Sequence, residues 1–267
     1  MESRIRIGID EQLWSAAWLE ALILPLKGQL PNVEIHSSAF DQLHPSLLRG
    51  DLDAVAHPLH LCPVVPPDGI AYSALLPREE PVSTLLIRPG AHQATALFQL
   101  KDNAKVYAPH PTFSAQLLDF RPDLELTPRI EHADAIVLGP FEAKYPSDPI
   151  LQLISVPLNP REVCPPPGSG AIVFQTCADD LPMRRSLKPL HHPETSALTN
   201  VERKVLRILG GNLREPLGVF CERDRMGNYQ VWVCHAPDSG QTLIRERLAS
   251  STVFELAERV AARIKPA

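Results

Sequence analysis

The first 57 residues alternate between strand-like and helix-like segments, and this order constrains the fold more than any other feature. Three short β-type runs are separated by two longer segments with apolar residues at helical spacing. In chain order these segments are 5–9, 13–30, 32–38, 40–51 and 52–57, and Gly50 is placed to close the second helix. A β-α-β-α-β order predicts a mostly parallel sheet flanked by helices, and therefore an α/β fold.

Two β-rich runs at 70–76 and 82–90 follow a proline-rich stretch at 62–69. A second unit with the same kind of order opens with a strand at 105–109 and a helix at 113–120. Its further strands are expected at 124–129, 133–139 and 150–156, and another strand at 170–177 follows a second proline cluster. The order of elements is repeated without obvious repetition of sequence.

The C-terminal third has a different pattern and predicts a small α+β domain. An amphipathic helix at 196–209 places Leu198, Val201, Val205, Ile208 and Leu209 on one face. Three alternating segments, at 216–224, 229–236 and 240–248, predict an antiparallel meander. A closing helix is expected at 252–264, with Ser251 or Thr252 as its cap and Glu255 completing a capping box.

Composition excludes several classes of protein. The net charge of −5 gives no basic surplus for a phosphate backbone, so we expect no nucleic-acid partner. No apolar run is long enough to span a membrane, and the N-terminus lacks an apolar signal core, so we expect a cytoplasmic protein without a membrane partner. The five cysteines are scattered and form no CxxC pair, which argues against a disulfide framework and a structural zinc site.

An ordered series of segments carries a resemblance to a known family. The segments are LLRGDLDAVAHPLHLCP, PPDGI, REEP, FRPDLEL, ADAIVLG, PPPGSGAIVFQT, LHHPETSALTNVER and LGGNLREPLGV. Together they resemble the hydroxymethylbilane synthase family, also called the porphobilinogen deaminase family. The resemblance covers nearly the whole chain and is strongest from Pro166 to Val219.

The resemblance implies a three-domain architecture. Two lobes of the periplasmic-binding-protein II type would be formed by 1–87 with 170–188 and by 88–169. The small domain would be formed by 189–267 and would carry the Gly-Gly-Asn loop at 210–212. The strand that begins at Gly170 would return to the first lobe.

The resemblance also implies a chemistry, which this chain fails to support at its key positions. The family joins four porphobilinogen units with loss of ammonia, on a dipyrromethane primer held by a cysteine thioether. The cysteine follows two glycines, but here Asn212 follows Gly210 and Gly211. A carboxamide cannot form the thioether, because the bond needs a thiolate-type nucleophile. We therefore expect no dipyrromethane cofactor.

Other positions of the family's site are also replaced. The first-lobe motif, usually His-Ser-x-Lys-Asp-x-Pro, runs here from His57 to Pro63, with His60 at the lysine position and Leu61 at the aspartate position. The paired arginines that hold substrate carboxylates fall at Thr112 and Phe113. The N-terminal Thr-Arg-x-Ser pattern is replaced by the residues Ile9, Asp10, Glu11 and Gln12, and a further arginine segment is missing between Leu126 and Ala133. We expect no catalytic residues, and the ligand-binding candidates are His57, His60, Thr112 and Asn212.

Several other signals favour structural roles. Cys221, nine residues after Asn212, is expected to be a small buried side chain. His57, His60 and Cys62 have metal-ligand chemistry, but their spacing is non-standard and no second cluster follows, so we expect no metal. The Cys-Pro pairs at 62–63 and 164–165 could ligate haem through a thiolate, but both lie in proline-rich connections. The resemblance implies that the stretch 191–195 is the entry into a helix, because the family has a similar stretch with a structural role there. Glu202 and Arg203 match a Glu-Arg pair of the family and are expected to form a buried or semi-buried ion pair.

Three hypotheses about function remain open at this stage. The first is a catalytically degenerate homologue that binds a small molecule in an interdomain cleft or regulates, still tied to tetrapyrrole metabolism. The second is an active enzyme of the same pathway with a non-covalent primer and a new set of carboxylate-binding arginines. The candidate arginines are Arg78, Arg88, Arg121, Arg129 and Arg161. The third is a scaffold that interacts with a protein partner in tetrapyrrole metabolism.

Overall fold

The computed structural model describes residues 4–12, 26, 30, 32–141, 153–237 and 243–265. The chain divides into two compact units, Met1–Arg78 with Ala171–Ser196 and Glu79–Gly170 with Ala197–Ala267, and each is described here by itself. Most of the helix expected at 13–30 lies outside the described residues. The predicted boundaries of the three domains stay a prediction. The two compact units divide the chain elsewhere, after Arg78, Gly170 and Ser196.

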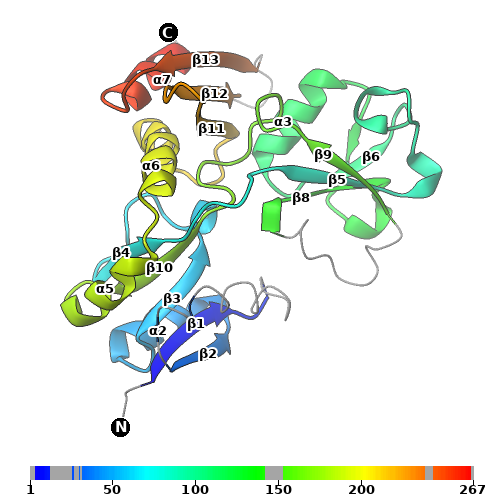
Figure 1. Cartoon of the computed structure of the whole chain (residues 1–267). Helices are drawn as coiled ribbons and strands as arrows, with labels where there is room; N and C mark the ends of the chain where they lie inside the picture. Colours follow the sequence, from blue (N-terminus) through cyan, green and yellow to red (C-terminus); the bar gives the residue numbers. More distant parts are fainter. Residues whose placement is uncertain are drawn as a thin grey trace. The chain divides into compact units, whose positions relative to one another are not determined.

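The first unit is built on a five-stranded sheet of order β2-β1-β3-β10-β4 (Figure 1). Its strands are β1 (Ile5–Asp10), β2 (Val33–Ser38), β3 (Ala54–Pro58), β4 (Ile70–Leu75) and β10 (Ile172–Cys177). β1 pairs in parallel with β2 and β3, whereas β10 pairs antiparallel with β3 and β4. The predicted parallel start is confirmed, and the strand near Gly170 does join the sheet formed by the N-terminal strands.

Helix α2 (Phe40–Arg49) covers part of this sheet, and the sequence specifies its end. Leu43 and Leu47 pack with Leu52, Val55 and Ile70 in one buried cluster. The helix ends at Gly50, which has a φ of 79° and donates its N–H to Leu47 O. A residue without a Cβ adopts this left-handed conformation at little cost, so the predicted closure by Gly50 is confirmed. Helix α5 (Leu181–Leu187) follows β10.

The second unit contains a five-stranded sheet of order β7-β6-β8-β5-β9. Its strands are β5 (Ser83–Ile87), β6 (Lys105–Tyr107), β7 (Glu125–Leu126), β8 (Ala135–Leu138) and β9 (Ile154–Leu158). β6 pairs in parallel with β7 and β8, so the 2-1-3 strand order of the first sheet recurs. Helix α3 (Pro111–Phe120) supplies Phe113 and Leu117 to the buried core of this sheet.

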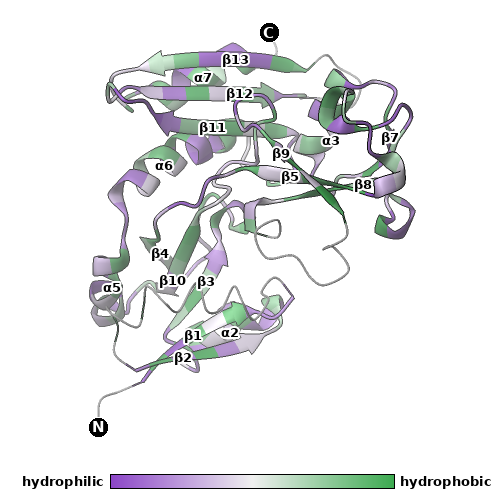
Figure 2. Cartoon of the chain, turned by 45° about the vertical axis from the view of Figure 1, so that its right-hand side comes forward, coloured by the Kyte–Doolittle hydropathy of each residue, from purple (hydrophilic) through white to green (hydrophobic). Residues whose placement is uncertain are grey.

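The second unit also contains an antiparallel sheet of order β11-β12-β13. Its strands are β11 (Leu217–Arg223), β12 (Tyr229–His235) and β13 (Ile244–Ser250), which confirms the predicted meander. β11 is buried over most of its length, whereas hydrophilic residues interrupt the hydrophobic colour along β13 (Figure 2). Helices α6 (Pro193–Ile208) and α7 (Leu256–Ile264) complete the C-terminal region. Short 3-10 turns elsewhere in the described residues are η1 (59–61), η2 (89–91), η3 (97–99), η4 (130–132) and η6 (188–190).

Two local predictions are wrong, for identifiable reasons. The capping box does not form, because the Thr252 hydroxyl accepts the N–H of Phe254 in a turn that precedes the helix. Glu255 then has a φ of 51°, and α7 begins only at Leu256 without a side-chain cap. The strand expected at 124–129 is reduced to Glu125–Leu126. The N–H groups of Glu125 and Thr127 still donate to β6 and its start, but the N–H of Arg129, the next donor on that side, turns back to the Thr127 hydroxyl.

The entry into α6 confirms the interpretation of the stretch 191–195. The His192 Nδ1 atom accepts the N–H of Thr195 at 3.2 Å and caps the first turn of the helix. The His191 Nδ1 atom accepts the N–H of Leu75 at 3.2 Å. Both imidazoles therefore have structural partners. None of the helices in the described residues has the length and apolar character that a membrane span requires.

A buried carboxylate on α6 fixes two segments of the second unit. Glu202 is fully buried, and its two oxygens accept the N–H groups of Gly168 and Cys221, each at 2.8 Å. One segment is the glycine turn before β10 and the other is β11. Two backbone donors that lie far apart in sequence therefore depend on one side chain.

Replacing Glu202 by alanine tests this dependence. We expect a loss of about 2–5 kcal/mol in the free energy of unfolding, because two buried N–H groups lose their acceptor. Glu202→Gln keeps one oxygen and should cost less. Urea denaturation measures both values, with Glu194→Ala at the exposed start of α6 as the control, expected to stay within about 0.5 kcal/mol of the wild type. An unchanged Glu202→Ala protein would contradict the dependence.

Candidate functional site

The first unit places polar side chains where an α/β sheet usually binds its ligand. In open α/β sheets that place is outside the carboxyl ends of the strands, where the strand order reverses. In the order β2-β1-β3 this point lies between β1 and β3. Asp10 ends β1 and is 5% exposed, and His57 lies at the end of β3 and is 3% exposed. A buried carboxylate and a buried imidazole thus share this edge.

A chain of polar contacts extends from His57 into the sheet. The Cys62 sulfur lies 3.8 Å from His57 Nδ1 and donates to Pro58 O at 3.4 Å. Gln175, on β10, donates its amide to the Cys62 sulfur at 3.1 Å and bonds His44 of α2 through its carbonyl oxygen. His57, Cys62, Gln175 and His44 therefore form one connected cluster.

The electrostatics keep His57 neutral. Burial lowers the pKa of His57, and the charge of Asp10 opposes this shift. His57 Nδ1 lies 3.4 Å from Pro58 O, and the Phe40 ring packs at 5.0 Å from the imidazole. With Nδ1 as the donor to Pro58, Nε2 carries a lone pair, and no hydrogen-bonding group among the described residues reaches it. A buried acceptor of this kind suits a ligand that brings an N–H or O–H group.

The other first-lobe candidate, His60, lies on the turn after β3. His60 and its neighbour Leu61 belong to η1 (Leu59–Leu61), and both side chains are half-buried. Leu61, at the position of the family's aspartate, has no ionisable group. Across the described ranges, with their gaps, the structure brings together no group of three or more His, Cys, Asp or Glu side chains able to hold a metal ion.

The Gly-Gly-Asn loop in the second unit has a backbone-determined shape. Gly210 and Gly211 have φ values of 109° and 77°, and Gly211 donates its N–H to Leu206 O at 2.9 Å to close α6. Side chains rarely adopt these angles, which explains why two glycines are specified. Asn212 is exposed, and its Oδ1 accepts the N–H of Arg214 at 2.9 Å. The Asn212 side chain thus caps a turn.

Thr112 lies next to the segment that follows Asn212. Its hydroxyl is buried and donates to Leu217 O at 2.9 Å. His110, which caps α3, accepts the N–H of Thr112 at Nδ1 and donates from Nε2 to Leu213 O at 3.0 Å. The structure therefore brings two predicted candidates, Thr112 and Asn212, into one neighbourhood, where Thr112 holds the loop in place.

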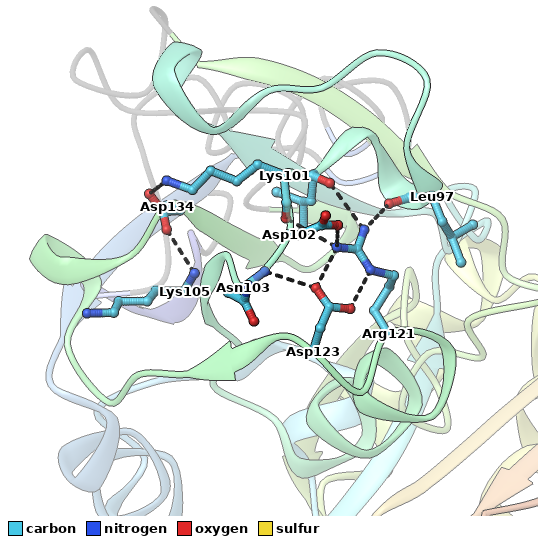
Figure 3. A network of polar contacts seen from close by, with 9 residues as sticks. Leu97, Lys101, Asp102, Asn103, Lys105, Arg121, Asp123 and Asp134 are labelled. Carbon is cyan, nitrogen blue, oxygen red and sulfur yellow. Dashed lines mark hydrogen bonds and ion pairs between the residues drawn. The ribbon is translucent and has the colours of Figure 1, made fainter.

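The arginines proposed as a new carboxylate-binding set are largely engaged by the protein itself. Arg121 pairs with Asp123 through two bonds of 2.7 Å and also donates to the carbonyls of Leu97, Leu100 and Lys101 (Figure 3). The hydrogen bond from Arg121 is the largest of the effects that hold the pKa of Asp123 below its ordinary value. The other engaged arginines are Arg88, which donates to Ala133 O, and Arg161, which makes a bidentate pair with Glu222.

Comparison with known protein families identifies the lineage of the chain. The family model described as "Porphobilinogen deaminase, dipyromethane cofactor binding domain" matches residues 26–185, which is more than half of the chain. The chain belongs to the porphobilinogen deaminase family. The predicted fold class is confirmed with it: two α/β sheets with the 2-1-3 strand order and a small C-terminal α+β region.

Curated relatives agree with this membership. The porphobilinogen deaminase of Chloroherpeton thalassium is 29% identical over 83% of this chain and 73% of its own length. That of Desulforamulus reducens is 30% identical over 68% of this chain, and the chain covers 60% of that relative's length. Among solved structures, a probable amino-acid ABC transporter extracellular-binding protein from Bacillus subtilis has a TM-score of 0.48 and 13% identity, over 70% of this chain and 90% of its own.

The sequence pointed to part of the first-unit cluster and missed the rest. His57 was found from the motif that follows β3. His44 and Gln175 were missed because they lie on α2 and β10, and only the sheet order β3-β10 brings them to the same place. Asp10 was noted as a departure from the family's N-terminal pattern, and its position at the end of a strand was the signal that could have marked it.

His110 predicts a pH-dependent stability of the second unit. Burial is the main cause that lowers its pKa to about 4, so the folded protein holds the neutral ring whose Nδ1 accepts from Thr112. The unfolded value is about 6.5, so stability is lost as the pH falls from about 6.5 to about 4, by an amount on the order of 3 kcal/mol.

Urea denaturation between pH 7 and pH 4 measures this effect. His110→Asn keeps an acceptor for Thr112 but cannot titrate, so its stability should fall less than that of the wild type. The same change at exposed His132 should leave the wild-type pH dependence intact. Identical pH profiles for His110→Asn and the wild type would contradict the assignment.

Proposed function

We propose that this chain is a catalytically degenerate porphobilinogen deaminase homologue that binds a small molecule within tetrapyrrole biosynthesis. The observation that carries the proposal is Asn212, which stands where the family attaches its primer. Its side-chain oxygen is engaged with the N–H of Arg214, and a carboxamide offers no nucleophile for a thioether. We expect the protein to act in the cytoplasm, as its sequence suggests.

The residues present do not fit a covalently held dipyrromethane. None of the five cysteines is part of the loop at 210–216. Cys221, the nearest in sequence, is fully buried in β11, and its backbone is bonded to Glu202. Cys164 and Cys234 are buried beside each other, and Cys62 lies in the first-unit cluster. A thiol could therefore replace the missing anchor only after the loop and its sheet had been rearranged.

The edge formed by Asp10 and His57 supports ligand binding. A buried carboxylate and a neutral imidazole whose buried Nε2 has no hydrogen-bond partner among the described residues favour a ligand rich in N–H groups. Porphobilinogen has this chemistry in its pyrrole N–H and its amine, and its two carboxylates would point away from Asp10 toward solvent. The family's aspartate position is Leu61, which cannot take part in proton transfer.

The alternative of an active enzyme with a non-covalent primer has less support. Such an enzyme needs free guanidinium groups for the carboxylates of its substrate. Arg121 donates its N–H groups to Asp123 and to backbone carbonyls, and Arg161 is paired with Glu222. Neither is available without breaking these bonds. The third hypothesis, a scaffold that binds a protein partner, has no support from the described residues beyond the sequence itself.

Porphobilinogen is the probe that tests the proposal. We expect calorimetric binding to the purified protein without formation of hydroxymethylbilane or release of ammonia. His57→Leu should weaken binding at least about tenfold, because the acceptor at Nε2 is lost. His132→Leu, at an exposed histidine of the second unit, should bind as the wild type does.

Two results would overturn the proposal. Formation of hydroxymethylbilane would show an active enzyme. Absence of binding, or equal affinity in His57→Leu and the wild type, would remove the ligand site from the Asp10–His57 edge.

A further inference from the structure

Two cysteines of the second unit meet in the folded protein although they lie far apart in sequence. The sulfurs of Cys164 and Cys234 are 3.6 Å apart and share a hydrogen bond. Cys164 lies in the connection between β9 and β10, and Cys234 lies on β12. A disulfide needs a sulfur separation of about 2.05 Å, so closure requires an approach of roughly 1.5 Å.

The backbone of Cys164 is held firmly next to β11. The buried Gln116 side chain accepts the N–H of Cys164 at 2.7 Å and donates to its carbonyl oxygen at 2.8 Å. Gly218, which pairs with Cys234 across the sheet, leaves room for this approach. A Cβ at Gly218 would lie 2.3 Å from Cys164 O. The position of Cys164 beside Cys234 therefore depends on the two hydrogen bonds with Gln116 and on the absence of a side chain at Gly218.

A guanidinium group lies against one of the two sulfurs. Arg245 Nη1 is 3.1 Å from Cys234 Sγ and 2.7 Å from Glu162 O. The Arg245 side chain is fixed by an ion pair with Asp119 at 3.1 Å and by stacking over the Phe120 ring at 4.2 Å. A positive charge held beside a thiol stabilises the thiolate.

The sulfur pair lines a pocket of about 360 Å³. Its wall includes Cys164, Cys234, Arg245, Phe120 and Trp232. Both cysteines contribute to this wall, although both are buried by area. The site thus combines a neighbouring thiol, a fixed cation and a cavity.

The two thiols are electrostatically unequal. The hydrogen bond shared with Cys164 and the charge of Arg245 lower the pKa of Cys234. The hydrogen bond shared with Cys234, together with burial, raises the pKa of Cys164. Cys234 is therefore the nucleophile of the pair, and Cys164 remains protonated beside it.

We propose that Cys234 and Cys164 form a peroxide-reactive thiol pair that closes to a disulfide. The Cys234 sulfur attacks one oxygen of hydrogen peroxide, so that an S–O bond forms, the O–O bond breaks and the second oxygen leaves as water after taking a proton. The Cys164 sulfur then attacks the Cys234 sulfur, so that an S–S bond forms and the S–O bond breaks. The hydroxyl leaves as water with the Cys164 proton. Two thiols and one peroxide give one disulfide and two waters.

The disulfide would join the β9–β10 connection to the antiparallel sheet. These segments already touch through the bond from Val219 N–H to Pro165 O at 3.0 Å. Oxidation would convert this non-covalent contact into a covalent link within the second unit. The pair requires neither the family activity nor the proposed ligand site in the first unit.

Treatment of the purified protein with hydrogen peroxide tests the pair. We expect loss of two of the five titratable thiols, loss of the mass of two hydrogen atoms, and a peptide map in which the peptides of Cys164 and Cys234 are linked. A thiol reductant should restore all five thiols. The Cys164→Ser and Cys234→Ser variants should each fail to form the link, whereas Cys177→Ser should still form it.

Two arginines of β13 supply a matched control for the rate. Arg245→Gln removes the charge beside the sulfur and should slow the loss of thiols about tenfold, the change in thiolate fraction for one pKa unit. Arg247→Gln removes a second positive charge that lines the same pocket. The Arg247 side chain stacks over the Trp232 ring, and no contact joins it to the sulfur. The Arg247→Gln variant should react at nearly the wild-type rate.

The wild-type peptide map decides the outcome even where a variant fails to fold. Retention of five thiols would overturn the proposal, and so would a link between other cysteines. Oxidation of Cys234 to sulfinic acid without a link to Cys164 would also overturn it, as would equal rates for Arg245→Gln and Arg247→Gln.

Discussion

The carboxylate of Glu202 is the interaction on which the second unit depends most. It is fully buried on α6 and accepts backbone N–H groups from the glycine turn at Gly168 and from Cys221 in β11. These bonds tie α6 to the connection that follows Cys164 and to β11. At its C-terminal end α6 is closed by Gly211, whose N–H donates to Leu206 O, and Asn212 caps the turn that follows. The shape of this loop is therefore set by its glycines and its backbone bonds.

Much of the fold follows from local pattern. The alternation of segments between residues 5 and 57 predicted the parallel start of the first sheet, and Gly50 predicted the end of α2. The apolar face at 196–209 and the three alternating strands predicted the C-terminal region. These features depend on neighbours in sequence. Thr252 shows the limit, because the same hydroxyl can cap a helix or the turn that precedes it, and tertiary packing selected the turn.

The candidate site was predicted only where a motif reports it. His57 and Asn212 were found because they occupy positions of recognised segments. The partners of His57 come from α2 and β10, far from it in sequence. The contact of Cys164 with Cys234 joins residues 70 positions apart, so scattered cysteines could not reveal it. Long-range pairing accounts for these two omissions. Arg121, a candidate in one of the three hypotheses, is a different case, because its partner Asp123 lies only two residues away and its other acceptors are mainly backbone carbonyls, which no motif reports.

The intact mass of the purified protein under denaturing conditions, together with a colour reaction with Ehrlich's reagent, decides whether the chain carries a dipyrromethane. We expect the mass of the bare chain and no colour, because Asn212 cannot hold a dipyrromethane and none of the cysteines is part of the loop at 210–216. An added mass that matches a dipyrromethane, together with a coloured adduct, would contradict this expectation. Such a result would mean that another residue has taken over the attachment.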